Sequence, residues 1–128
     1  MLQDTLADAL SAIKNAERLG KGECVVNSTK LIREVLKMFR DRSYISSFEF
    51  VNDGKNGKFR VELRGKIIDC NVIKPRFSIR VDDFDRLEKR FLPSRDLGFL
   101  IITTPKGVMD HKRAKEMKIG GKLLGFVY

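Results

Sequence analysis

Residues 97–109 read LGFLIITTPKGVM and join an apolar run to a short polar loop. The run from Leu97 to Ile102 is apolar throughout, which is typical of a strand that is covered on both faces. The segment from Thr103 to Met109 contains two hydroxyls, an ammonium and a glycine, and it has no carboxylate. Residues 103–109 are therefore a candidate binding loop, although many polar loops of this kind are only turns.

The chain downstream of this loop predicts a helix and a last strand. Asp110 can cap a short helix that runs to Met117, because its carboxylate can accept from the first free backbone amides. The pair Gly120-Gly121 ends that helix, and residues 123–128 have the apolar character of a final strand.

The chain upstream of the loop is less regular. Apolar and polar residues alternate over 77–81, which predicts a strand. Residues 87–91 are ambiguous and could form a helical turn before Pro93 interrupts regular structure. We therefore expect residues 71–128 to be mostly β with one short helix.

The first half of the chain alternates helix-like and strand-like patterns. Apolar residues recur at three- and four-residue spacing from Leu2 to Ile13 and from Leu31 to Phe39, which predicts two amphipathic helices. The expected order is helix, strand, helix and two hairpin strands, with the strands over 23–26, 47–50 and 58–63 and a turn over 52–57.

The ends of these two helices have recognisable signals. Asp4 can cap the first helix, and Gly20 stands where a left-handed residue would end it. Either Ser28 or Thr29 can cap the second helix.

The chain is predicted to be an α+β protein with two small domains, residues 1–70 and 71–128. The seam lies in residues 72–76, because proline restricts both itself and the residue before it. Residues 1–70 hold 13 basic and 10 acidic residues, whereas residues 71–128 hold 13 and 7. The shorter second half thus carries most of the positive charge.

The total composition points to a polyanionic partner. The 128 residues carry a net charge of +9 and have a pI near 9.8, which is typical of nucleic-acid-binding domains. Anionic membrane is the competing partner, but no apolar run approaches the roughly 20 residues of a membrane span. No secretory signal is evident at the N-terminus, so we expect a cytoplasmic protein without a membrane anchor.

Metal and cofactor sites are not expected. Cys24 and Cys70 lie in apolar, strand-like surroundings, which predicts buried thiols in a reducing compartment. His111 is the single histidine, so the sequence contains no clustered ligand set for zinc. The sequence therefore predicts a protein that binds no cofactor.

Two further groups of residues are candidate reactive sites. His111 beside Asp110 could act as a general base, but we expect a surface histidine and no catalysis, because no nucleophile or oxyanion group accompanies it. Asp82, Asp83 and Asp85 could bind a divalent cation, but no further ligands complete the site, and a solvated turn is the preferred interpretation.

A basic series with interleaved aromatics favours RNA over DNA. Cations attract phosphate and aromatics can stack on unpaired bases, although the phenylalanines could equally belong to the core. A hydroxyl-rich loop suits the wide minor groove of RNA, where 2′-hydroxyls and base edges are exposed. The series consists of Lys74, Arg76, Arg80, Arg86, Lys89, Arg90 and Arg95, with Phe77, Phe84 and Phe91 between them.

Several stretches of the sequence resemble those of a known family. Residues 103–109, followed by Gly120-Gly121 and an aromatic carboxyl end, resemble the S-eight family, the eighth protein of the small ribosomal subunit, in its archaeal type. The similarity extends over nearly all of the chain. Supporting matches are Leu6-Ala7, Ile13-Lys14-Asn15-Ala16, Lys30-Leu31, Lys74-Pro75-Arg76-Phe77 and Leu92-Pro93-Ser94-Arg95-Asp96.

The resemblance implies a function and a set of contact residues. It implies a structural, non-enzymatic protein that binds the central domain of small-subunit (16S) ribosomal RNA, helps its folding and subunit assembly, and neighbours other small-subunit proteins. Its hydroxyl loop would enter the minor groove, and its amino-terminal positions would touch the RNA backbone. Carried over by position, the RNA-binding residues are Thr103, Thr104, Lys106, Gly107, Gly121, Lys122, Lys14, Asn15, Thr29 and Lys30.

The sequence departs from the family pattern at two places. Pro105 stands where the family usually has a third hydroxyl residue, and it has no backbone donor. Asn27 stands where a proline usually precedes the second helix, which weakens the assignment of Thr29. Two other functions stay open: a translational repressor that binds a messenger RNA mimic of the ribosomal site, and an RNA-processing enzyme with His111 as base.

Overall fold

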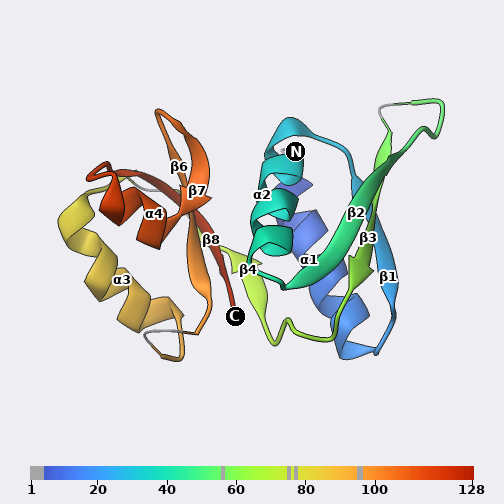
Figure 1. Cartoon of the computed structure of the whole chain (residues 1–128), viewed down its shortest axis with the longest axis horizontal. Coiled ribbons are helices and arrows are strands. Elements are labelled where there is room, and N and C mark those ends of the chain that lie inside the picture. The colour runs from blue at the N-terminus through green and yellow to red at the C-terminus, as the bar shows by residue number, and fades with distance from the viewer. Residues whose placement is uncertain (1–4, 56, 75, 77, 95–96) are drawn as a thin grey trace. The chain divides into compact units, whose positions relative to one another are not determined.

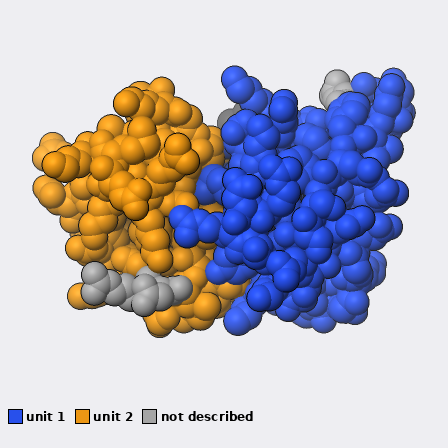
Figure 2. Space-filling view, in the orientation of Figure 1, with its two compact units in different colours: residues 1–68 blue, residues 69–128 orange. Residues whose placement is uncertain are grey.

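The computed structural model describes residues 5–55, 57–74, 76, 78–94 and 97–128. These residues form two compact units, residues 1–68 and 69–128, which are coloured separately in Figure 2. The fold is α+β, as predicted (Figure 1). That the chain consists of two independent domains divided after Cys70 stays a prediction.

The first unit is a three-stranded antiparallel sheet with two helices, in the predicted order. Strand β3 lies between β1 and β2. The two helices bury an apolar face, which includes Leu10 and Phe39, while their other faces stay exposed. The elements are α1 (Thr5–Arg18), β1 (Glu23–Asn27), α2 (Lys30–Asp41), β2 (Ile45–Val51) and β3 (Lys58–Leu63).

In the first unit, the helix ends follow the sequence signals where these can be compared. Gly20 has a φ of +73°, and its amide donates to the Glu17 carbonyl, so it ends α1 in the left-handed conformation. Thr29 caps α2, because its hydroxyl accepts from the Ile32 amide at 3.1 Å. Asp4, the predicted cap of α1, lies outside the described residues.

The second unit is a mainly antiparallel β structure with short helices. The strand order is β4-β8-β6-β7, and β5 also pairs with β8. Strand β6 is therefore paired on both of its edges. The elements are β4 (Cys70–Val72), β5 (Ser78–Ile79), a 3-10 turn η1 (Val81–Asp83), α3 (Phe84–Phe91), β6 (Phe99–Thr104), β7 (Gly107–Asp110), α4 (His111–Glu116) and β8 (Gly121–Val127). In this unit, α4 ends at Glu116, four residues before the predicted stop at Gly120-Gly121.

Residues 78–91 differ most from the expectation. The expected strand over 77–81 is reduced to Ser78–Ile79, and the ambiguous segment is a full helix, α3. The Asp83 carboxylate accepts from the Arg80 amide at 2.9 Å, which closes η1 and turns the chain into α3. This local hydrogen bond ends the strand earlier than the alternation of apolar residues predicts. Phe77 lies outside the described residues.

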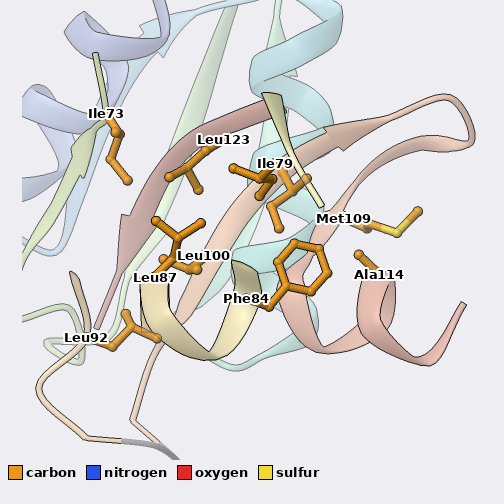
Figure 3. Close-up of a cluster of buried hydrophobic side chains, with 10 residues drawn as sticks. Ile73, Ile79, Phe84, Leu87, Leu92, Leu100, Met109, Ala114 and Leu123 are labelled. Carbon is orange, nitrogen blue, oxygen red and sulfur yellow. The ribbon is translucent and has the colours of Figure 1, made fainter. Parts of the chain in front are cut away.

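The helices of the second unit cover one face of its sheet. Figure 3 shows Phe84 and Leu87 of α3 and Ala114 of α4 beside the strand residues Leu100 and Leu123. All five side chains are at most 2% exposed. The buried cluster consists of Ile73, Ile79, Phe84, Leu87, Leu92, Leu100, Ile102, Met109, Ala114 and Leu123.

Two of the candidate stacking aromatics belong to this packing. Phe84 is fully buried and therefore cannot reach a base. Phe91 is half-buried and stacks on Phe126, with ring centroids 5.9 Å apart. The alternative that these phenylalanines are core residues is thus correct for Phe84.

His111 is a core residue, so the expectation of a surface histidine is wrong. It is 1% exposed, its Nδ1 accepts from the Leu100 amide at 3.1 Å, and its Nε2 lies 3.4 Å from Glu88 Oε1. Burial lowers the pKa of His111 below its ordinary value, although Glu88 acts in the opposite direction. A buried imidazole whose Nδ1 already accepts a backbone amide cannot serve as the base of an RNA-processing enzyme.

Both cysteines are free thiols, and the expectation that they are buried is confirmed for Cys70 alone. Cys70 is buried and Cys24 is partly buried. Burial, followed by the charges of Glu17 and Glu23, raises the pKa of the Cys24 thiol to about 11. At neutral pH Cys24 is therefore protonated and a poor nucleophile.

The buried histidine predicts how stability depends on pH. The unfolded chain binds a proton on His111 near its ordinary pKa of 6.5, whereas the folded chain does so only at a lower pH. The contribution of His111 to stability is therefore complete above pH 6.5, and it is lost as the pH falls from there through the lower pKa of the folded chain. We expect a lower midpoint of urea unfolding at pH 5.5 than at pH 7.5, and a smaller difference in His111→Asn.

The control for this prediction follows from the composition. His111 is the single histidine, so carboxylates dominate the remaining titration and act mainly at lower pH. An equal or greater stability of the natural chain at pH 5.5 would contradict the assignment of a buried neutral imidazole.

Candidate nucleic-acid interface

The candidate loop is the tip of a β-hairpin. Strand β6 continues to Thr104 and β7 begins at Gly107, and these two residues are paired. Only Pro105 and Lys106 lie between the strands, so the segment expected as a loop is largely strand. Figure 1 shows this hairpin, β6–β7, at one end of its unit. The hairpin brings Thr103 and Thr104 of β6, Lys106 of the turn and Gly107 of β7 together.

The Thr104 hydroxyl is engaged within the turn. It donates to the Gly107 carbonyl at 2.8 Å and accepts from the Lys106 amide at 3.1 Å. Thr104 is only 8% exposed. Because its single hydroxyl proton is already donated, Thr104 shapes the turn and has only acceptor capacity left for a ligand.

The backbone of the turn explains both Pro105 and Gly107. Proline fixes φ near −65° and suits the first central position of a turn, where no amide donor is needed. Lys106 is not among the described residues with positive φ, whereas Gly107 has a φ of +117°. A turn of negative φ followed by glycine in the positive region is a common way to close a hairpin. Pro105 therefore fits the turn, although it removes the third hydroxyl.

A row of side chains crosses four strands next to this tip. Thr103 pairs with Val108 of β7 and with Lys122 of β8, and Lys122 pairs with Ser78 of β5. Paired residues in antiparallel strands project from the same face of the sheet. We call Ser78, Lys122, Thr103 and Val108 the Thr103 row.

The Thr103 row faces away from the buried cluster. The neighbouring paired residues Met109, Ile102 and Leu123 belong to that cluster, and adjacent residues of a strand point to opposite faces. Ser78 and Lys122 are exposed, and Thr103 is partly exposed. This face therefore presents two hydroxyls and an ammonium.

The Thr103 row depends on close backbone contact at Gly121. A Cβ placed on Gly121 would lie 2.1 Å from the Thr103 carbonyl oxygen, and one on Gly120 would lie 2.4 Å from the Ile79 carbonyl oxygen. No residue with a side chain fits there without a shift of backbone. Gly121 thus acts through its lack of a side chain, which lets β8 approach β6.

Positive charge surrounds this face. Within the described part of the chain, neither Lys106 nor Lys122 lies within salt-bridge distance of a carboxylate. Exposed basic side chains also flank β5, namely Lys74, Arg76 and Arg80. The basic residues of α3 are exposed, but Arg86 pairs with Asp83 at 3.2 Å. Arg95 lies outside the described residues.

The amino-terminal candidates lie in the first unit. Lys14 and Asn15 are on α1, while Thr29 caps α2 and Lys30 is its first residue. The first turn of α2 has no acidic residue. An ammonium beside the amides of a helix N-terminus favours a phosphate, so the start of α2 suits the RNA backbone.

Sequence reasoning missed Ser78. The alternation over 77–81 predicts a strand but not its partner, and only the pairing of β5 with β8 places Ser78 beside Lys122. The position of Ser78 between two apolar residues of that alternation was the one available signal, because it predicts a side chain that faces away from the core.

Two aspartates of the cluster, Asp83 and Asp85, make contacts within the protein. Asp83 accepts from the Arg80 amide, and Asp85 pairs with Lys115 at 2.7 Å. The described residues contain no group of three or more His, Cys, Asp or Glu side chains that could hold a metal ion. Among the described helices, none has the length and apolar character needed to cross a membrane.

Several known proteins are similar to this chain over nearly its full length. Residues 4–128 match the model of the family described as Ribosomal protein S8. The chain is 55% identical to "Small ribosomal subunit protein uS8" of Methanococcoides burtonii, over all of this chain and 99% of that protein. It is 50% identical to the protein of that name from Archaeoglobus fulgidus over the full length of both, and 46% identical to that of Methanosphaerula palustris over 98% of each.

The contact at Gly121 predicts a specific loss of stability. We expect Gly121→Ala to lower the free energy of unfolding by about 1–3 kcal/mol, because the new methyl group forces β8 away from the Thr103 carbonyl. Gly22→Ala is the matched control, since a Cβ there meets nothing within 4 Å and should change stability by no more than about 0.5 kcal/mol. Equal effects in urea unfolding would show that the approach at Gly121 is not tight.

Proposed function

Because this chain belongs to the ribosomal protein S8 family, we propose that it binds the central domain of small-subunit ribosomal RNA and helps that RNA to fold during subunit assembly. It is a structural, non-enzymatic protein of translation and works in the ribosome of the cytoplasm. Other proteins of the small subunit are its neighbours in this proposal.

The observation that carries the proposal is the Thr103 row beside the hairpin tip. The row combines the exposed hydroxyl of Ser78 and the partly exposed hydroxyl of Thr103 with the ammonium group of Lys122, and none of its members is a carboxylate. Lys106 adds a second exposed ammonium group in the adjacent turn. Hydroxyls can read 2′-hydroxyls and base edges in the shallow minor groove of RNA, while ammonium groups hold the phosphates beside it.

The two threonines have different roles in this proposal. Thr103 projects from the exposed face and contacts RNA directly, whereas Thr104 holds the turn and offers only an acceptor. Gly107 allows close approach of the RNA, because it is exposed and has no side chain. Lys14, Asn15, Thr29 and Lys30 supply backbone contacts from the first unit.

The direct test is footprinting of the purified protein on small-subunit ribosomal RNA across a salt series. We expect protection at one discrete site, with binding that weakens as salt rises. Lys122→Ala and Lys106→Ala should each weaken binding and reduce the salt dependence by roughly one counterion. Lys115→Ala is the matched control, because Lys115 lies on α4 and pairs with Asp85.

The outcomes separate the proposal from its alternatives. Protection at no discrete site would overturn it. Equal losses for Lys115→Ala and Lys122→Ala would mean that general charge, and not the Thr103 row, drives binding.

The threonines provide a second, sharper prediction. We expect Thr103→Val to weaken RNA binding by about 1–3 kcal/mol with little change in stability, because polar RNA groups lose a partner. Thr104→Val should lower the stability as well, since it removes both turn hydrogen bonds. Affinity is measured by filter binding and stability by urea unfolding. Unchanged binding by Thr103→Val would remove Thr103 from the site.

A further inference from the structure

The base of the hairpin is closed by a side chain where the β-ladder stops. The last pair between β6 and β7 is Ile101 with Asp110, and the next residue, His111, already begins α4. The amide of Leu100, which is fully buried, therefore has no strand carbonyl opposite it. His111 Nδ1 accepts this amide at 3.1 Å, in the position that a ladder carbonyl would otherwise occupy.

The hydrogen bond from the Leu100 amide to His111 selects one neutral tautomer of the imidazole. Since Nδ1 accepts, the ring proton must be on Nε2, which lies 3.4 Å from Glu88 Oε1 on α3. His111 and Glu88 are 1% and 9% exposed. The ring thus contacts β6, α3 and α4 at one buried point.

We propose that His111 is a positioning residue for the RNA-binding hairpin, because its imidazole fixes the register of β6 and β7 from the base. This inference rests on the proposed function. Leu100 and Thr104 are on the same strand, and a slip of one residue would turn Thr103 toward the buried cluster. The side chain that closes the base therefore determines which face the tip presents to RNA.

The charges around the ring are consistent with a neutral imidazole. Glu88 of α3 and Asp110 at the end of β7 favour protonation, and Lys112 of α4 opposes it. Asp85 of α3 and Lys115 of α4 pair with each other, and β6 contributes no charged residue. Burial outweighs the two carboxylates and lowers the pKa of His111.

Two substitutions of His111 distinguish the role of its hydrogen-bond acceptor from that of the size of its ring. His111→Phe keeps an aromatic ring but leaves the Leu100 amide without an acceptor. His111→Asn is the matched rescue, because its amide oxygen can occupy the place of Nδ1. The probe is the ribosomal RNA fragment that the natural chain protects at pH 7.5, and the full chain is used throughout.

We expect His111→Phe to bind this RNA about tenfold more weakly, with faster hydrogen exchange of the Leu100 amide, and His111→Asn to stay within about threefold of the natural chain. Acidification through the lowered pKa of His111 should weaken RNA binding by the natural chain more than by His111→Asn, because protonation of Nδ1 removes the acceptor. Unchanged binding by His111→Phe, or equal losses by both variants, would overturn the proposal.

A measurement on the natural chain alone covers the case in which His111→Phe does not fold. Nitrogen-15 shifts of the imidazole at pH 7.5 report which nitrogen carries the proton. A proton on Nε2 supports the proposal, and a proton on Nδ1 overturns it. If the natural chain protects no discrete RNA site, the proposed function fails by itself, whatever the histidine measurements give.

Discussion

The close approach of β8 to β6 at Gly121 is the constraint on which the candidate interface depends. Side chains would separate the two strands there, since a Cβ on Gly121 would lie 2.1 Å from the Thr103 carbonyl oxygen. With glycine present, Lys122 pairs with Thr103 on one side and with Ser78 on the other. One backbone contact thus sets the spacing of the hydroxyls and the ammonium.

The two adjacent threonines show how strand geometry divides similar side chains. Thr103 belongs to an exposed row, whereas Thr104 is buried and bonded within the turn. Their chemistry is identical, so the difference comes from the alternation of faces along β6. A positional match to a family assigns both threonines as RNA contacts, whereas the structure exposes the side chain of Thr103 and uses that of Thr104 within the turn.

Periodicity predicted most of the elements, because amphipathic patterns are local and both helices of the first unit follow them. The caps at Thr29 and Asp110 were also predictable, because each cap hydrogen bond joins two residues that are three positions apart in the chain. Features that depend on strand pairing and on contacts between elements could not be predicted from the sequence. Ser78 joins the site only through its pairing with β8, and His111 is buried only because β6 and α3 meet its ring. The extent of α3 was missed because the hydrogen bond from Arg80 to Asp83 overrides the preceding alternation.

Pro105 has a consequence for the kinetics of recognition. The tip has one fixed φ angle and a hydroxyl that bridges the turn, so few conformations are open to it before RNA arrives. A segment that is already ordered loses little conformational entropy on association. If the tip binds RNA as proposed, the encounter is governed by diffusion and charge, with no slow step of loop ordering, so the stiffness of the tip increases the rate at which the complex forms.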